Sequence, residues 1–146
     1  MKRIKIVSYI IIFFVFIFIT YTIYYKPTTV NEILTSNNLS REQFNYLYIY
    51  DNNSVMTIKD KNKINNLLSY MKQLTIIESL KNDIPKSTNK YMISFENSKT
   101  NNSLRITILN KNFIEIGLKI PNKIIYKKYR ILNKPIDFTD INNLLK

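Results

Sequence analysis

The densest group of residues that could bind a ligand lies near the C-terminal end of the chain, where cations alternate with tyrosines over residues 126–130. On a β-strand, alternate side chains of such a segment share one face. The candidate anion-binding patch consists of Lys119, Lys123, Tyr126, Lys128 and Arg130. This patch would suit the phosphates of lipids or envelope polymers. The alternative is a solvent face or sheet edge that lysines protect from aggregation.

A second group of cations surrounds the start of a predicted helix. Lys59, Lys61 and Lys63 crowd its N-terminus, where positive charge opposes the helix dipole. Free N–H groups in the first turn of a helix can bind an anion, so these lysines form a second candidate anion site. Asp60 lies among them and would repel an anion. Helix capping by Asp60 is therefore the alternative interpretation.

The sequence predicts no catalytic or metal site. The chain contains neither Cys nor His, which excludes disulfides, thiol nucleophiles, histidine bases and almost all zinc sites. Ser69 and Lys72 match the S-x-x-K motif of penicillin-interacting enzymes, but the companion motifs of that class are missing. Asp137 and Asp140 could pair for acid–base chemistry, although helix capping explains them more simply. We expect a non-enzymatic protein without a cofactor.

An apolar segment near the N-terminus must hold the rest of the chain at a membrane. Residues 6–25 carry no charge, and as a helix they are long enough to cross a bilayer core of about 30 Å. The segment is longer than the apolar region of a signal peptide and lacks a small-x-small cleavage site, which favours a retained anchor. Lys2, Arg3 and Lys5 precede it, so we expect a cytoplasmic tail at residues 1–5 and an extracytoplasmic domain.

The rest of the chain is basic. Lys2, Arg3, Lys5 and Lys26 are the only cations among the first 26 residues, and all 10 acidic residues follow them, so the remainder carries a net charge of +8. Such a surface attracts anionic polymers, lipid headgroups or nucleic acid. An alternative origin is genome composition, because Ile, Asn, Lys, Tyr and Phe are residues of A+T-rich codons.

The elements downstream predict an α+β domain. Residues 26–43 form a juxtamembrane segment with a short helix, which a Thr29–Glu32 capping box begins. Residues 44–146 form the domain, in which an amphipathic helix at 61–74 packs on an antiparallel sheet of five to seven strands. The expected strands are 44–50, 55–59, 75–80, 91–96, 104–109, 113–120 and 124–132. A loop at 81–90 contains Pro85, and Asp137 or Thr139 caps a final short helix.

Several segments carry a family resemblance: residues 57–60 (TIKD) leading into 64–68 (INNLL), then Pro85, 91–95 (YMISF) and 129–131 (YRI). Over about residues 44–145, the chain resembles a domain of unknown function found in membrane-anchored or lipoprotein ectodomains of low-G+C Gram-positive bacteria. The chain departs from the lipoprotein members because it has no Cys to lipidate, so an uncleaved helix would serve as the anchor. The resemblance implies a location and no chemistry.

Together these features predict a single-pass membrane protein with a non-catalytic extracytoplasmic binding or interaction module, acting as an accessory subunit, a sensor or a self-protection factor. Its expected partners are the membrane and an anionic envelope polymer or another envelope protein. The first alternative is an inverted topology, in which a basic cytoplasmic domain binds anionic lipid or nucleic acid. The second is a small hydrolase that uses Asp, Glu, Lys or Tyr.

Overall fold

The computed structural model describes residues 2–24, 26–51, 54–79 and 91–145, with the side chains of its first helix described for residues 9–22. The chain order of the elements is α1 (Lys2–Tyr24), β1 (Thr28–Thr29), α2 (Val30–Ser36), β2 (Tyr46–Asp51), β3 (Ser54–Ile58), α3 (Lys61–Lys72), β4 (Thr75–Glu78), β5 (Tyr91–Asn97), β6 (Asn102–Asn110), β7 (Phe113–Ile120), β8 (Lys123–Ile131) and α4 (Phe138–Leu145). The expected α+β class is confirmed.

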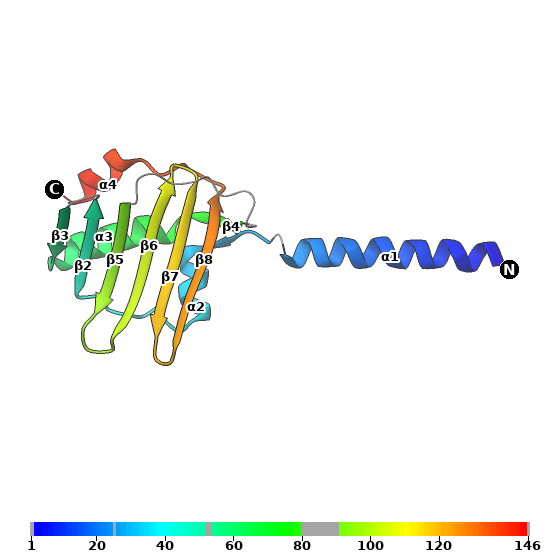
Figure 1. Cartoon of the computed structure of the whole chain (residues 1–146), viewed down its shortest axis with the longest axis horizontal. Helices are drawn as coiled ribbons and strands as arrows, with labels where there is room; N and C mark the ends of the chain where they lie inside the picture. The colour runs from blue at the N-terminus through cyan, green and yellow to red at the C-terminus, as the bar shows by residue number, and fades with distance from the viewer. Residues whose placement is uncertain (1, 25, 52–53, 80–90, 146) are drawn as a thin grey trace.

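The strands form one antiparallel sheet in the order β1-β4-β8-β7-β6-β5-β2-β3 (Figure 1). The hairpin β2–β3 and the meander β5–β8 match the prediction. The sheet has eight strands within the described residues, one more than the upper limit expected. The additional strand is the two-residue β1, which pairs with β4 through Thr28 and Thr29 and carries no periodicity that a sequence could show.

One face of the sheet is covered by helices. In Figure 1, α3 crosses behind the strands, with α2 behind the β8 side. The core lies between this face and the helices, and the fully buried side chains include Leu34, Ile64, Leu67, Met71, Ile93, Phe95, Leu104, Ile106 and Ile114. Apolar residues alternate along β2, β5, β6 and β7 because one face alone packs against the helices. The opposite face carries no helix among the described elements.

The helix caps follow the predictions closely. Thr29 accepts from the backbone N–H of Glu32 while the Glu32 carboxylate accepts from that of Thr29, which completes the capping box of α2. Asp60 accepts from the N–H groups of Asn62 and Lys63 at the start of α3. Asp137 accepts from the N–H of Thr139, so it is the residue that caps α4. The predicted loop at 81–90 lies outside the described residues.

Residues 26–43 belong to the domain rather than standing apart from it. Val30 and Leu34 of α2 are completely buried, and Leu39 is nearly so. The backbone N–H of Val30 also donates to the carbonyl of Leu74, 3.2 Å away. The apolar side of this short helix therefore closes the core next to β4. A helix of seven residues is too short to be stable by itself, so α2 depends on this packing.

The N-terminal helix α1 extends away from the sheet beyond β4 (Figure 1). It covers most of the predicted apolar segment, and its described side chains from Tyr9 to Ile19 are exposed. A search of the described residues finds no helix that combines the length and the apolar character needed to span a membrane. Among the described side chains, the hydrophobic core contains none from α1, so we expect residues 26–146 to fold without it.

A carboxylate holds the turn between β5 and β6. Glu42 accepts hydrogen bonds from Asn97, from Thr100 at 2.8 Å and from Asn102 at 2.7 Å. Partial burial acts to raise the pKa of Glu42, but these three hydrogen bonds outweigh it and hold the pKa below its ordinary value. The ionised carboxylate therefore stabilises this end of the sheet.

We predict that Glu42 makes folding stability sensitive to acid. Because its folded pKa lies below the unfolded value of 4.5, its contribution is present above that pH and disappears as pH falls through the folded pKa. Glu42→Gln should lower the free energy of unfolding at pH 7 by about 1 kcal/mol, after allowance for solvent screening. Urea unfolding of residues 26–146 between pH 7 and pH 3 should show this difference vanishing in acid.

Glu78→Gln is the matched control, because Glu78 pairs with Lys127 at the surface, where both side chains are about half exposed. An exposed ion pair contributes little, so this variant should stay within about 0.5 kcal/mol of the unmodified domain. A difference between Glu42→Gln and the unmodified domain that persists undiminished at pH 3 would contradict the assignment.

Candidate binding surface

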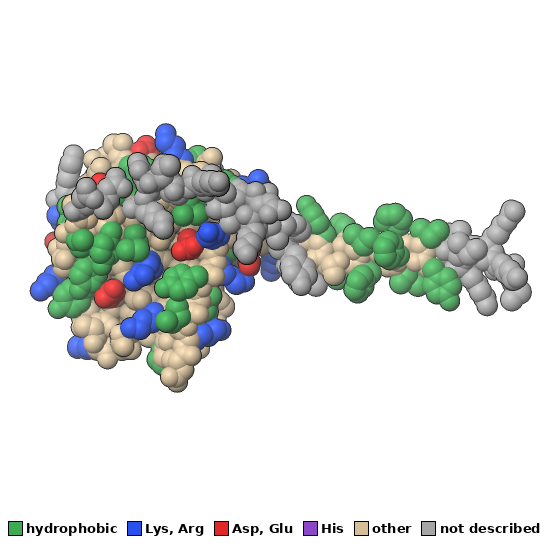
Figure 2. All heavy atoms as spheres, in the orientation of Figure 1, with side chains coloured by type: hydrophobic (Ala, Val, Ile, Leu, Met, Phe, Trp, Pro, Cys, Tyr) green, Lys and Arg blue, Asp and Glu red, His purple; other side chains and the backbone are tan. Residues whose placement is uncertain are grey.

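Tyrosines and cations gather on the face of the sheet opposite α2, α3 and α4, and we call it the uncovered face. Figure 2 shows this face, with patches of hydrophobic side chains among cations and carboxylates. The antiparallel register sets its rows: Tyr48, Ser94, Arg105, Gly117 and Tyr126 stand opposite one another across five strands. The sheet thus assembles residues that are distant in sequence into one surface.

One half of the uncovered face, over β2 and β3, is rich in tyrosine, and we call it the tyrosine half. Tyr46, Tyr48 and Tyr50 point to this face from alternate positions of β2. The rings of Tyr46 and Tyr48 stack with centroids 6.1 Å apart, and the ammonium of Lys59 lies 5.2 Å from the centroid of Tyr46. Since the ring faces of Tyr46 contact these neighbours, this half offers ring edges and hydroxyl groups to a ligand.

Protonation of the Tyr48 hydroxyl group favours hydrogen bonding over charge attraction. Partial burial raises the pKa of Tyr48, and the negative charge of Glu96 raises it further. Tyr48 is therefore neutral at physiological pH and can both donate and accept a hydrogen bond. The tyrosine half suits a polar, hydroxyl-bearing or anionic partner that Lys59 can also reach.

Small residues and one arginine occupy the centre of the uncovered face. Ser94 is completely buried there, and its hydroxyl donates to the Glu96 carboxylate at 3.1 Å. Arg105 stands between Ser94 and Gly117, and its buried Nε has no hydrogen-bond partner within the described residues. A buried donor without a partner is costly, and a bound acceptor would remove that cost.

The aromatic ring of Tyr126 lies across Gly117 on the neighbouring strand. A Cβ atom at position 117 would come within 2.6 Å of the Tyr126 Cε1 atom. Glycine, the only one in the chain, therefore lets the tyrosine ring approach the backbone of β7 closely. Tyr126 keeps 56% of its surface exposed in this position, so it remains available to a ligand.

The first predicted anion patch falls mainly on the other half of the uncovered face, over β7 and β8. Alternation places Lys119, Tyr126, Lys128 and Arg130 on this face and Lys123 on the opposite one. The strand β4 flanks β8 only over residues 129–131, so within the described strands the patch lies partly at a sheet edge, which the alternative interpretation allowed. It is a solvent-facing surface, which leaves both binding and plain solvation open.

The cations of this patch differ in how they are paired. Lys119 donates to the side-chain amide of Asn101 at 3.0 Å, and Lys128 lies 3.8 Å from the Glu115 carboxylate. Arg130 and Lys123 have no ion-pair partner among the described residues. Positive charge at this half is therefore only partly neutralised.

The second predicted group of lysines is dispersed by the fold. Lys59 packs over Tyr46 on the uncovered face. Lys61 lines a cavity of about 490 Å³ with Glu42 and Lys99. Lys63 donates to the carbonyl of Leu145 at 2.7 Å, where positive charge complements the C-terminal end of α4. These three cations do not converge on one site, and Asp60 caps the helix.

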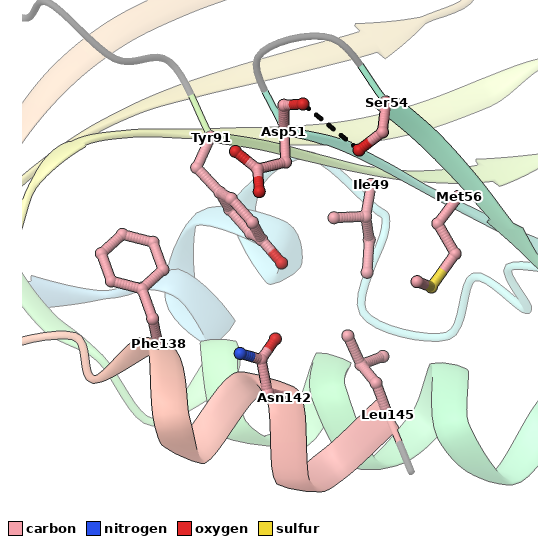
Figure 3. Close-up of a pocket in the computed structure, with 8 residues that line it drawn as sticks. All are labelled: Ile49, Asp51, Ser54, Met56, Tyr91, Phe138, Asn142 and Leu145. Carbon is pink, nitrogen blue, oxygen red and sulfur yellow. Dashed lines mark hydrogen bonds between the residues drawn. The ribbon is translucent and has the colours of Figure 1, made fainter.

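A groove of about 360 Å³ lies between the sheet and α4 (Figure 3). The sheet lines one side of the groove with Ile49 and Asp51 of β2, Ser54 and Met56 of β3, and Tyr91 of β5. The helix α4 lines the other side with Phe138, Asn142 and Leu145. The rings of Tyr91 and Phe138 meet edge to face, 5.2 Å apart. The lining is mostly apolar, with a single carboxylate.

The groove does not assemble a hydrolytic site from its described residues. The Ser54 hydroxyl donates to the backbone carbonyl of Asp51, 3.3 Å away, rather than to a general base. Burial raises the pKa of Tyr91, and the charge of Asp51 raises it further, so this phenol stays protonated at neutral pH and does not serve as a general base. Among the described residues, no three acidic side chains gather as a metal site.

Comparison of the chain with protein-family models, curated proteins and solved structures finds no match. The resemblance to membrane-anchored ectodomains therefore stays a prediction.

Sequence reasoning missed three components of the uncovered face. Tyrosines alternate over residues 46–50, and this pattern predicts a strand without indicating a binding surface. Arg105 and Gly117 gave no local signal, because their importance depends on the register that places them beside Tyr126 and Ser94. A pairing of strands was needed to find them.

We predict that the Tyr126 ring shifts the NMR resonances of Gly117. An aromatic ring current shifts the signals of protons close to the ring, so the Gly117 Hα signals should lie outside their usual range and return to it in Tyr126→Leu. Gly117→Ala should displace the ring yet change unfolding free energy by less than about 1 kcal/mol, because the clashing atom ends a flexible side chain. Unchanged Gly117 signals in Tyr126→Leu would show that the ring lies elsewhere.

Proposed function

We propose that this chain is a single-pass membrane protein whose C-terminal domain is a non-catalytic, extracytoplasmic binding module. The observation that carries the proposal is the uncovered face, a whole side of a sheet that presents tyrosines and cations. The buried Nε of Arg105, which has no hydrogen-bond partner among the described residues, lies at its centre. Antiparallel sheets with one solvated face are common, but the solvated side is then usually plainly polar. Here large aromatic side chains stand on it, as on a recognition surface.

The proposed anchor is α1 together with the residue that follows it. At 1.5 Å per residue, the 23 residues of α1 extend about 34 Å, which exceeds a bilayer core of about 30 Å. Residues 6–25 carry no charge, and Phe13, Phe16 and Phe18 are more than 60% exposed. The proposal rests on the sequence of the whole segment, including positions whose side chains lie outside the described ones. Apolar side chains on all sides of a helix require an apolar surrounding.

The proposed partner is an anionic envelope polymer or another envelope protein. The net charge of +8 on residues 27–146 favours association with an anionic partner. The tyrosine half adds hydrogen-bonding groups, which select a partner by geometry rather than by charge alone. An accessory, sensor or self-protection role would each use such a surface.

We predict that protease added to intact cells digests the domain of the full-length protein. Three cations precede the apolar segment and one follows it closely, so the domain should lie outside the cytoplasmic membrane. The measurement is immunoblotting of a C-terminal tag after digestion, and the undigested band should run at the full mass of 17.4 kDa plus the tag. A cytoplasmic protein serves as the lysis control.

Protection of the domain until the cells are lysed would reverse the proposed topology. The inverted alternative, a basic domain that binds anionic lipid or nucleic acid in the cytoplasm, would then take its place.

We predict that residues 26–146 bind polyglycerol phosphate through the tyrosine half. Lys59→Gln removes the cation over Tyr46 and should weaken binding roughly fivefold, as the loss of about 1 kcal/mol implies. Lys61→Gln makes the same charge change on α3, at the covered side of the sheet, and should leave affinity unchanged. Titration calorimetry at constant ionic strength measures both. Equal losses in the two variants would mean that net charge, not this surface, governs binding.

A further inference from the structure

The fold brings the basic strand β8 close to the end of α1. Three residues separate Tyr24 from Thr28, so β1 begins within about 14 Å of the helix end. The order β1-β4-β8 then puts the end of β8, at residues 129–131, two strand spacings away, which is about 10 Å. Figure 1 shows the same arrangement, with α1 beyond the edge formed by β4 and with β3 at the far edge of the sheet.

The side chains of β8 on the uncovered face combine charge with apolar surface. Ile124 is 63% exposed and Tyr126 is 56% exposed. Lys128 and Arg130 follow on the same face, and Lys119 stands opposite Ile124 on β7. Exposed apolar and aromatic side chains beside cations are typical of protein surfaces that lie in the interfacial region of a bilayer.

We propose that this end of the uncovered face docks on the anionic phospholipid headgroups of the bilayer in which α1 is anchored. The docking surface consists of Lys119, Ile124, Tyr126, Lys128 and Arg130. The inference rests on the proposed anchoring by α1, and it holds for either orientation of the chain across the membrane. Docking would fix the sheet relative to the membrane and leave the tyrosine half, at the far edge, free for a partner.

Charge and position together favour lipid over a soluble anion as the occupant. Arg130 lies near the proposed anchor without any change in the fold, because β4 and β1 follow this end of β8 in the sheet, and Lys128 precedes it on the same face. Ile124 and Tyr126 gain from leaving water at a bilayer, whereas a soluble phosphate would give their apolar surface nothing. Arg130, which has no carboxylate partner among the described residues, keeps its full charge for a headgroup.

The test uses the absence of cysteine from the chain, which makes a single introduced thiol a unique probe. Ile124→Cys reports on the docking surface and Val55→Cys on the far edge strand β3. Their parent side chains are almost equally exposed, at 63% and 61%. Full-length protein is reconstituted into vesicles of phosphatidylglycerol with phosphatidylcholine, or of phosphatidylcholine alone. The rate of reaction with a membrane-impermeant maleimide is then measured, and only outward-facing domains are counted.

In phosphatidylglycerol vesicles, Cys at position 124 should react roughly tenfold more slowly than Cys at position 55, since each cation adds to a favourable docking energy. In phosphatidylcholine alone the two rates should be similar. Adding Lys128→Gln and Arg130→Gln should restore the rate at position 124. The matched pair Lys61→Gln and Lys99→Gln changes the charge equally at another place and should leave the protection intact.

Equal rates at the two positions in phosphatidylglycerol vesicles would overturn the proposal. Loss of protection with both charge pairs alike would overturn it too, because the attraction would then belong to net charge and not to this surface. Resistance of the same vesicles to alkaline extraction is measured in parallel. If the protein resists extraction but shows equal rates, the anchor holds and the docking proposal fails. If alkali releases the protein from the vesicles, the proposed anchoring by α1 is itself wrong.

Discussion

The fold depends on the burial of one face of a wide sheet under the helices α2, α3 and α4, which together contain few residues. Apolar side chains at alternate positions of β2, β5, β6 and β7 require cover, and α2, α3 and α4 supply it from the same side. Even β1 and α2, which follow α1, serve this purpose by closing the core beside β4. Since α2, α3 and α4 all pack on one face of the sheet, the opposite face must contact water or a partner. The side chains of that opposite face therefore determine what the domain can bind.

Much of this architecture was predictable because local signals agreed with the final fold. The capping residues Thr29 and Asp60 lie where the sequence places them, and the meander from β5 to β8 follows the alternation of its apolar residues. Two-residue strands and sheet order have no such signal. The distant pairing of β2 with β5 and of β4 with β8 arises from packing, so neither could be deduced from periodicity.

The candidate site was predictable only in part for the same reason. Tyr126, Lys128 and Arg130 alternate along one strand, so their common face could be deduced without a structure. Lys123 was grouped with them by proximity in sequence, but strand alternation turns it to the opposite face. Likewise, Lys59 and Lys63 are near neighbours in the chain but are directed to Tyr46 and to the end of α4. Nearness in sequence indicates a shared site only when the period of the element agrees.

The most direct test of this account is solvent paramagnetic relaxation of the full-length protein in neutral-lipid nanodiscs, with a soluble gadolinium chelate. In the protein without a bilayer, Phe16 and Val55 are nearly equally exposed, at 65% and 61%. If α1 lies in the bilayer and the domain outside it, the Val55 methyl signals should relax strongly and the Phe16 ring signals hardly at all. Equal relaxation of the two residues would show that α1 is in water and would contradict a membrane-anchored binding module.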